Sequence, residues 1–301
     1  MNTLYHELTK LLKGMSGVLV AFSGGVDSTV LLATAQDALG DRAVAVTAAS
    51  PIFPAQDLKF ARKTVSRLGV RWIMLETDEL DDPQFRTNPP NRCYYCKIRL
   101  FSLILTKAAE EALPMVIEGT NADDLSDFRP GLSALKELGI RSPFLELGIG
   151  KQEIRRLAKE MGLENWDKPS SACLASRIPY GEEITRERLN RIAEAETLLR
   201  EMGFRQVRAR DHGSLARIEL PAEDMNRLLG PRLRETVVEA CKRAGYTFVT
   251  VDLQGYRTGS LNEALRTDER RNCGFRQLSN DCKEVQNSIV SKQAVDDENK
   301  S

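Results

Sequence analysis

Short apolar runs alternate with helix-forming stretches through the first half of the chain, and this alternation constrains the fold more than any other feature. The runs are expected to be strands over residues 18–22, 43–47, 71–75 and 115–118. The stretches between them are expected to be helices over residues 28–39, 55–68 and 97–111. Strands that are separated by helices pair in parallel, with the helices covering both faces of the sheet. The sequence therefore predicts a doubly wound α/β fold that binds its ligand at the carboxyl ends of the strands.

The pattern changes after Tyr180 and Gly181, which form a turn-like stretch. Thr185 follows as the expected cap of a long charged helix that runs to about Met202. Further strands are expected over residues 206–210, 216–220 and 247–252, with a helix that ends near residue 244 before the last of them. This second half is expected to be a small α+β domain.

The chain has 301 residues, a length that accommodates about two domains. The expected division is a nucleotide-binding domain over 1–181, a small substrate or oligomerisation domain over 182–266, and a tail over 267–301. The tail is polar and has no periodicity, so it is predicted to be disordered.

Composition excludes several classes of protein. Lys and Arg together number 43, as do Asp and Glu, so the chain lacks the basic field that proteins coating nucleic acids need. The only histidines are His6 and His212, too few for a multi-histidine zinc site, and a Ser-His-Asp triad is not indicated. No apolar run approaches the ~20 residues that span a bilayer, and the first residues lack the basic start of a signal peptide. We expect a cytoplasmic protein that binds neither nucleic acid nor membrane.

A glycine loop follows the first expected strand and opens the first expected helix. Its residues are Ser23, Gly24, Gly25, Val26, Asp27 and Ser28. The backbone N–H groups at a helix N-terminus bind anions, and adjacent glycines let the backbone approach a phosphate closely. It is not a Walker A loop, because no Gly-Lys-Ser/Thr follows at the required spacing. The alternative is an ordinary glycine turn.

This loop resembles the PP-loop of the ATP-pyrophosphatase superfamily. The resemblance implies that ATP is cleaved between its α- and β-phosphates to form an adenylate, while Mg²⁺ neutralises the departing pyrophosphate. It also implies that Ser23, Gly24, Gly25 and Ser28 cradle the phosphates and that Asp27 helps to hold the metal.

Five further motifs narrow the resemblance to the LarE family, which matches from about residue 16 to residue 259. They are RCYYCK at 92–97, EGTNADD at 118–124, DFRPGL at 127–132, SSACLASRIPYG at 170–181 and ARIELP at 216–221. Membership implies an ATP-dependent sulfur transferase for the nickel-pincer nucleotide cofactor of lactate racemase. Its small-molecule substrate would be pyridinium-3,5-biscarboxylic acid mononucleotide, whose carboxylates are adenylated and converted to thiocarboxylates. The resemblance also implies a homo-oligomer.

The cysteines distinguish two ways of supplying sulfur. In some LarE proteins a cysteine gives up its own sulfur, but that position falls here at Ala172, one residue before Cys173. Cys93 and Cys96 form a CxxC pair that the sacrificial form lacks. The three cysteines resemble the LarE type in which they hold a [4Fe–4S] cluster, whose open iron receives sulfur from sulfide or a donor protein. The alternatives are a zinc pair or redox dithiol at the CxxC and a buried apolar role for Cys173.

Two arginines are candidates for the phosphate of the substrate. Arg208 and Arg210 lie on one face of an expected strand, and paired guanidinium groups bind phosphate well. The resemblance assigns substrate-phosphate binding to both and places Glu196 in the same site. The alternative is a solvated strand face with salt bridges.

Three more residues are candidates near the reacting groups. Arg177, close to the cysteine loop, is a candidate catalytic or anion contact, although it could pair with a carboxylate instead. Asn121 and Asp124 follow an expected strand end, where they could contact ATP or Mg²⁺. Asn121 could equally be a helix cap.

Other functions stay open at this point. A tRNA thiolase shares the chemistry but needs a basic surface or an RNA-binding module. An amide-forming ligase shares the loop but needs no cysteine trio. A non-catalytic nucleotide-binding protein would release no pyrophosphate.

Overall fold

The computed structural model describes residues 3–126 and 129–265. Its larger sheet contains four parallel strands in the order β3-β2-β1-β4. In chain order they are β1 Val18–Ala21, β2 Ala43–Ala49, β3 Arg71–Glu76 and β4 Met115–Ile117. Val18 on the central strand pairs with both Ala43 and Met115. The expected doubly wound sheet is confirmed.

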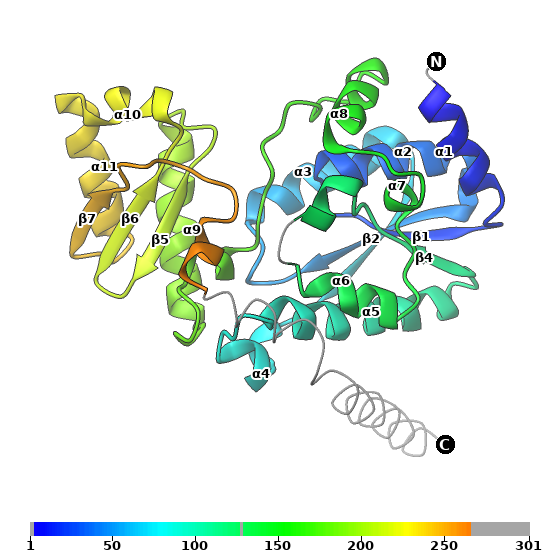
Figure 1. Cartoon of the computed structure of the whole chain (residues 1–301), viewed down its shortest axis with the longest axis horizontal. Coiled ribbons are helices and arrows are strands. Elements are labelled where there is room, and N and C mark those ends of the chain that lie inside the picture. Colours follow the sequence, from blue (N-terminus) through cyan, green and yellow to red (C-terminus); the bar gives the residue numbers. More distant parts are fainter. Residues whose placement is uncertain (1–2, 127–128, 266–301) are drawn as a thin grey trace.

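Helices cover both faces of this sheet (Figure 1). They are α1 Thr3–Lys13, α2 Val26–Leu39, α3 Ala55–Leu68, α4 Pro83–Arg86, α5 Arg92–Glu110, α6 Gly131–Glu137, α7 Pro143–Glu146 and α8 Lys151–Glu160. One face, which includes Val18 and Ala45, packs against α1, α2, α3 and α8. The opposite face, which includes Leu19 and Val44, packs against α5. Successive side chains of a strand point to opposite faces of the sheet. Because helices cover both faces, the residues on both sides of these strands are apolar.

A smaller sheet follows, drawn on the left in Figure 1. Its strands are β5 Arg208–His212, β6 Leu215–Glu219 and β7 Phe248–Val251, and its helices are α9 Arg186–Glu201, α10 Ala222–Leu229 and α11 Pro231–Arg243. β6 pairs antiparallel with β5 and parallel with β7. All three helices contribute to one apolar core against this sheet, including Leu199, Leu228 and Val237. The predicted small α+β unit is present.

Several element boundaries differ from the sequence prediction. Helix α5 begins at Arg92, after Pro89, Pro90 and the cap residue Asn91, rather than at Lys97. The prediction missed its first turn because that turn lacks the apolar periodicity on which the prediction relied. The helix expected to end near residue 244 is two helices, broken at Gly230, after which Pro231 opens the second. The predicted cap is confirmed, since Thr185 Oγ1 accepts a hydrogen bond from the Arg188 N–H at 3.2 Å.

Two sequence predictions are limited by the extent of the description. The tail predicted to be disordered, with Cys273 and Cys282, lies outside the described residues. Within the described ranges, no helix is both long and apolar enough to cross a membrane.

Candidate active site

The glycine loop connects the carboxyl end of β1 to the start of α2. Gly24 has a positive φ of 73°, a conformation that favours glycine. The Gly25 N–H donates to Ser23 Oγ at 3.3 Å, and the Ser28 hydroxyl donates to the Gly25 carbonyl at 3.1 Å. Ser23 Oγ and Ser28 Oγ lie 3.2 Å apart. The loop is therefore held by its own side chains at the helix N-terminus, where anions bind.

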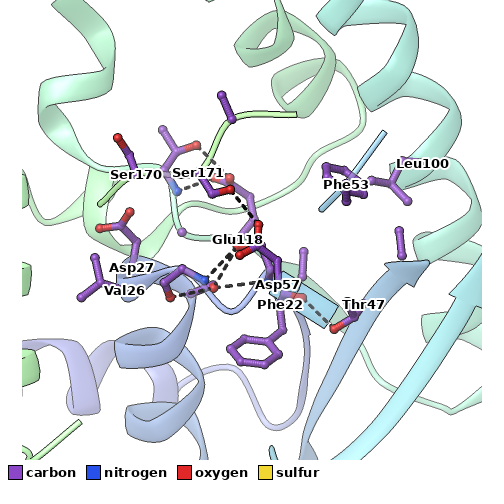
Figure 2. Close-up of a pocket in the computed structure, with 18 of the residues that line it drawn as sticks. Phe22, Val26, Asp27, Thr47, Phe53, Asp57, Leu100, Glu118, Ser170 and Ser171 are labelled. Carbon is purple, nitrogen blue, oxygen red and sulfur yellow. Dashed lines mark hydrogen bonds between the residues drawn. The ribbon is translucent and has the colours of Figure 1, made fainter. Parts of the chain in front are cut away.

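A cavity of about 430 Å³ lies over this loop at the carboxyl ends of the strands (Figure 2). Its lining comes from the ends of β1, β2 and β4, from α5, and from residues 168–172. Gly119, after β4, approaches the start of α2 so closely that a Cβ there would lie 3.1 Å from the Ser28 nitrogen. The cavity lies where the topology predicts a ligand.

Asp27 stands in the first turn of α2 and forms an ion pair with Lys151, the first residue of α8. Burial raises the pKa of Asp27 above its ordinary value, against the opposing effect of Lys151, and the nearby Asp124 raises it further. Asp27 Oδ1 is buried without a hydrogen-bond partner. Carboxylate oxygens are preferred Mg²⁺ ligands, so the donors at Asp27 and Asp124 fit such an ion.

Asn121 and Asp124 are in contact, since the Asn121 N–H donates to Asp124 Oδ2 at 3.1 Å, but only one of them reaches the cavity. Asp124 lines the cavity and pairs with Arg129 at 2.8 Å. Asn121 is buried, and its Oδ1 accepts the Asp123 N–H at 3.1 Å, which is the capping arrangement left open by the sequence. Asn121 is not among the residues that line the cavity.

The segment 168–171 lines both this cavity and a second one of about 150 Å³ that adjoins it. Asp57 on α3 anchors the segment, because its carboxylate accepts from Lys168 Nζ at 3.0 Å and from the Ser171 hydroxyl at 2.7 Å. The second cavity is basic, with Arg177, Arg200, Arg205, Arg208 and Lys168 in its lining. Two adjoining cavities of this kind can hold two anionic ligands end to end.

The three candidate cysteines lie close together. Cys93 and Cys96 lie near the start of α5, three residues apart and so on one helix face, and Cys173 directly precedes a short 3-10 helix, Leu174–Arg177. Burial raises the pKa of the Cys93 thiol, and the charge of Cys173 adds to this. Burial and then the charges of Glu79 and Cys173 raise the pKa of Cys96 well above its ordinary value. All three thiols are free.

The thiols of these cysteines are groups that bind metal ions, but they are not arranged as a complete metal site. The described ranges contain no group of three or more His, Cys, Asp or Glu side chains already placed to hold a metal ion. Three converging, half-buried free thiols nevertheless fit the thiolate donor set that iron–sulfur clusters use.

Asn88 joins the two chain segments that carry the cysteines. It is fully buried at a positive φ of 56°, and its Nδ2 donates to the carbonyls of Ile178 at 3.3 Å and Pro179 at 2.7 Å. Its Oδ1 accepts from Arg92 Nη1 at 2.7 Å, and the Arg92 guanidinium lies over the Tyr180 ring. This bridge fixes the start of α5 against the chain that follows Cys173.

Arg177 holds the cysteine loop from behind. Its Nη1 donates to the carbonyls of Ala172 at 2.9 Å and Cys173 at 3.1 Å. Its Nε and Nη2 donate to the two carboxylate oxygens of Glu196 at 2.7 and 3.0 Å. Arg200 pairs with the same carboxylate, which has no exposed surface. Arg177 thus has the carboxylate partner that the sequence left open.

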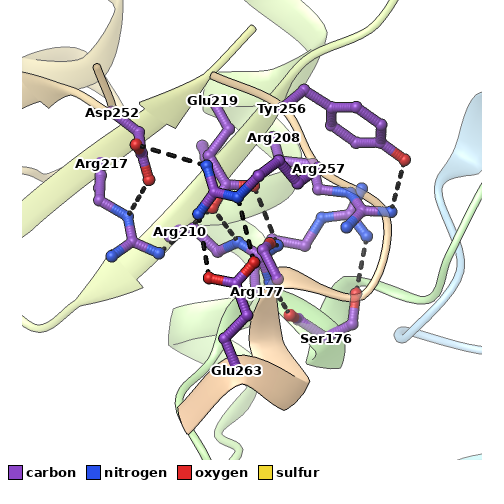
Figure 3. Close-up of polar contacts among 12 residues, drawn as sticks. Ser176, Arg177, Arg208, Arg210, Arg217, Glu219, Asp252, Tyr256, Arg257 and Glu263 are labelled. Carbon is purple, nitrogen blue, oxygen red and sulfur yellow. Dashed lines mark hydrogen bonds and ion pairs between the residues drawn. The ribbon is translucent and has the colours of Figure 1, made fainter. Parts of the chain in front are cut away.

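Arg208 and Arg210 lie on the same face of β5 but in different surroundings (Figure 3). Arg210 is 2% exposed and donates to Glu219 through Nε and Nη2, both at 2.9 Å. Arg208 lies over the Tyr256 ring and donates to its hydroxyl at 3.0 Å. Burial lowers the pKa of Arg208 from its ordinary value. Arg208 lines the second cavity, but Arg210 does not. Glu196 does not line it either.

Sequence reasoning missed several residues that the fold brings to the site. Lys151, Arg200 and Arg205 carry no local signal, since each lies in an ordinary charged segment. Lys168 could have been found, because it lies just before the motif at 170–181.

Comparisons with known proteins agree with this architecture. A family model described as NAD synthase matches residues 2–88, the part that contains the glycine loop. A pyridinium-3,5-bisthiocarboxylic acid mononucleotide synthase from Lactiplantibacillus plantarum is 38% identical over 86% of this chain and 93% of its own length. The chain belongs to the LarE family.

Two other proteins are also similar to this chain. An uncharacterized protein from Synechocystis is 44% identical over 86% of this chain and 97% of its own length. A tRNA-specific 2-thiouridylase from Rickettsia felis is 27% identical over 52% of this chain and 53% of its own length. LarE membership makes the chain an ATP-dependent sulfur transferase with a PP-loop.

Proposed function

We propose that this enzyme adenylates the carboxylates of pyridinium-3,5-biscarboxylic acid mononucleotide and converts them to thiocarboxylates. The product would serve the nickel-pincer nucleotide cofactor of lactate racemase, in a cytoplasmic homo-oligomer, as the family resemblance implies. The observation that carries the proposal is the adjoining pair of cavities, one over the PP-loop and one lined by arginines, with the chain leading to Cys173 between them. A nucleotide on each side would meet at that chain.

ATP occupies the larger cavity in this proposal. Ser23, Ser28 and the backbone of Gly24 and Gly25 cradle its phosphates at the start of α2. Asp27, with the buried Oδ1 that has no partner, would hold Mg²⁺ together with Asp124. When bound, the ion neutralises the charge of the departing pyrophosphate.

The phosphate of the substrate occupies the smaller, basic cavity. Arg208 would contact it directly, since it lines that cavity together with Arg200 and Arg205. Arg210 and Glu196 belong to the same site, where they hold neighbouring side chains in place and do not contact the phosphate. Arg210 is paired with Glu219, and Glu196 fixes Arg177 and Arg200.

Sulfur would reach the adenylate from a [4Fe–4S] cluster held by Cys93, Cys96 and Cys173. When bound through three cysteines, such a cluster supplies an open iron position at which sulfide, free or from a donor protein, is held as a nucleophile. This protein's own contribution is to orient the thiols, through Asn88 on one segment and Arg177 on the other. Ala172 lines the larger cavity and directly precedes Cys173, so Cys173 would lie near a nucleotide bound there.

The decisive experiment measures iron and acid-labile sulfide in anaerobically purified protein, beside a Cys93/Cys96/Cys173 triple alanine variant. Cys241→Ala is the matched control, because Cys241 is a buried cysteine in the core of the small sheet. We expect the wild type and the control to carry a cluster and the triple variant to lose it. A wild type that resists cluster reconstitution would refute the cluster.

A single substitution, Cys173→Ala, separates adenylation of the substrate from sulfur transfer. Cys173→Ala is expected to abolish thiocarboxylate formation while substrate-dependent pyrophosphate release continues. Sustained sulfur transfer by Cys173→Ala over many turnovers would refute the assignment. Thiolation of tRNA, with no reaction of the biscarboxylate nucleotide, would identify tRNA as the substrate and refute the proposed one.

A further inference from the structure

The two cavities share a wall, and Lys168 is the cation in it. The residues that line both are Asp57 and the run 168–171. The other cations of the first cavity are Lys97, Arg129 and Lys151, and none of them lines the second. Conversely, the arginines of the second cavity do not line the first. Among the described lining residues, Lys168 alone presents a positive charge to both.

The Lys168 ammonium is held in place from several sides. Its Nζ lies 3.0 Å from Asp57 Oδ1, 3.3 Å from the Gly24 carbonyl oxygen of the PP-loop, and 4.6 Å from the centre of the Phe60 ring. The side chain is 24% exposed, so it remains accessible from the cavities. A cation fixed in this way needs little reorganisation to meet a developing negative charge.

We propose that Lys168 is a catalytic residue that contacts the α-phosphate of ATP during adenylation. This inference rests on the proposed function. With ATP over the PP-loop and the substrate phosphate among the arginines, the carboxylate and the α-phosphorus meet at the shared wall. A carboxylate oxygen bonds to that phosphorus, the bond from phosphorus to the bridging oxygen breaks, and pyrophosphate leaves with the electron pair.

The charges of this step explain why a cation belongs there. An anionic carboxylate approaches an anionic phosphate, and negative charge accumulates on the non-bridging oxygens in the transition state. Lys151 is paired with Asp27 and lines only the first cavity. Lys168 lines both cavities, so its ammonium group can reach both the α-phosphate and the carboxylate. After adenylation it stays on the phosphate of AMP, which leaves when sulfur attacks the carbonyl carbon.

A purely structural role is the competing explanation, because Lys168 also ties the segment 168–171 to α3 and to the PP-loop. Asp57→Asn discriminates between the two, since it weakens that tie and leaves the ammonium in the wall. Lys63→Met is the matched control, as Lys63 is an exposed lysine that pairs with Glu164.

The test compares binding of AMP and of adenosine by titration calorimetry. Lys168→Met is expected to weaken AMP about ten- to hundredfold and to leave adenosine unchanged, because only AMP carries the α-phosphate. Lys168→Arg is expected to recover most of the AMP affinity. With ATP and substrate, kcat/KM for pyrophosphate release by Lys168→Met is expected to fall by about 10²- to 10³-fold, more than the nucleotide affinity falls, because the negative charge at the α-phosphate is greatest in the transition state.

Each outcome bears on one proposal. Unchanged AMP affinity in Lys168→Met, or equal losses for AMP and adenosine, would overturn the catalytic assignment. So would a loss in Asp57→Asn as large as that in Lys168→Met. A wild type that binds AMP but releases no pyrophosphate with the biscarboxylate nucleotide would refute the proposed substrate, while AMP binding would still decide the role of Lys168.

Discussion

Replacing Glu196 by glutamine tests the buried ion pair behind the cysteine loop. The carboxylate has no exposed surface and accepts from Arg177 Nε at 2.7 Å, from Arg177 Nη2 at 3.0 Å and from the Ala209 N–H at 3.2 Å. Arg177 is itself 3% exposed. Glu196→Gln therefore leaves a buried guanidinium without its neutralising charge, which costs roughly 3–5 kcal/mol. At roughly 2–4 °C per kcal/mol, the midpoint of thermal unfolding should fall by about 6–20 °C.

The effect has a defined pH dependence. Burial favours the neutral acid, but the Arg177 guanidinium outweighs it and lowers the pKa of Glu196 below its ordinary value of 4.5. A lowered pKa in the folded state means that the ion pair stabilises the protein above the unfolded-state pKa and is lost as the pH falls through the folded-state pKa. The difference between wild type and variant should be full at pH 7 and should shrink on acidification below about 4.5.

Urea denaturation followed by circular dichroism at several pH values measures this difference. The control is Glu194→Gln on the same helix, an exposed position where the expected change is below about 0.5 kcal/mol. Equal stability of Glu196→Gln and Glu194→Gln at pH 7 would refute the reasoning. Because Arg177 also holds the carbonyls of Ala172 and Cys173, sulfur transfer should decline more than adenylation in Glu196→Gln.

Three further predictions follow from other parts of the structure. Asn88→Gly keeps the positive φ accessible but removes the side-chain bridge, so we expect lower iron retention with unchanged ATP affinity; iron retention equal to wild type would contradict the bridge. Burial raises the pKa of Cys241 to about 11, so in cluster-free protein iodoacetamide at pH 8 should label Cys241 more slowly than Cys173 until urea unfolds the chain, as peptide mass spectrometry would show. Leu31→Ala should lower the free energy of unfolding by about 2–5 kcal/mol in urea titrations, and a loss below about 1 kcal/mol would show that α2 is not tightly packed.

Local signals were sufficient to place the PP-loop between a strand and a helix. The PP-loop was predicted from Ser23 to Ser28 because a strand end, paired glycines and a helix start are all encoded within a few residues. The expected helix over 55–68 was correct at both ends, with Pro54 before it and Gly69 at its C-cap. The start of α5 was wrong because Arg92, Cys93 and Cys96 give no apolar stripe, although Arg92 is buried in the fold.

Strand periodicity placed Arg208 and Arg210 on one face but could not distinguish their environments. Alternation depends only on the backbone, so a shared face follows from the sequence. Whether a guanidinium meets a carboxylate depends on the neighbouring strand, and Glu219 on β6 lies where it pairs with Arg210. Tyr256, from a distant part of the chain, contacts Arg208 instead.

The sequence by itself determined the order of strands and helices, the PP-loop and the cap at Thr185, because periodicity, turn chemistry and capping act between residues that are neighbours in the chain. Only the tertiary structure decided which charges meet and which thiols converge. Asp27 with Lys151 and Glu196 with Arg177 are contacts between distant segments, and Cys173 lies near enough to Cys93 and Cys96 for its charge to raise their pKa. Such contacts depend on how buried surfaces pack together, and the position of Lys168 in a wall common to two cavities exists only once those surfaces have closed.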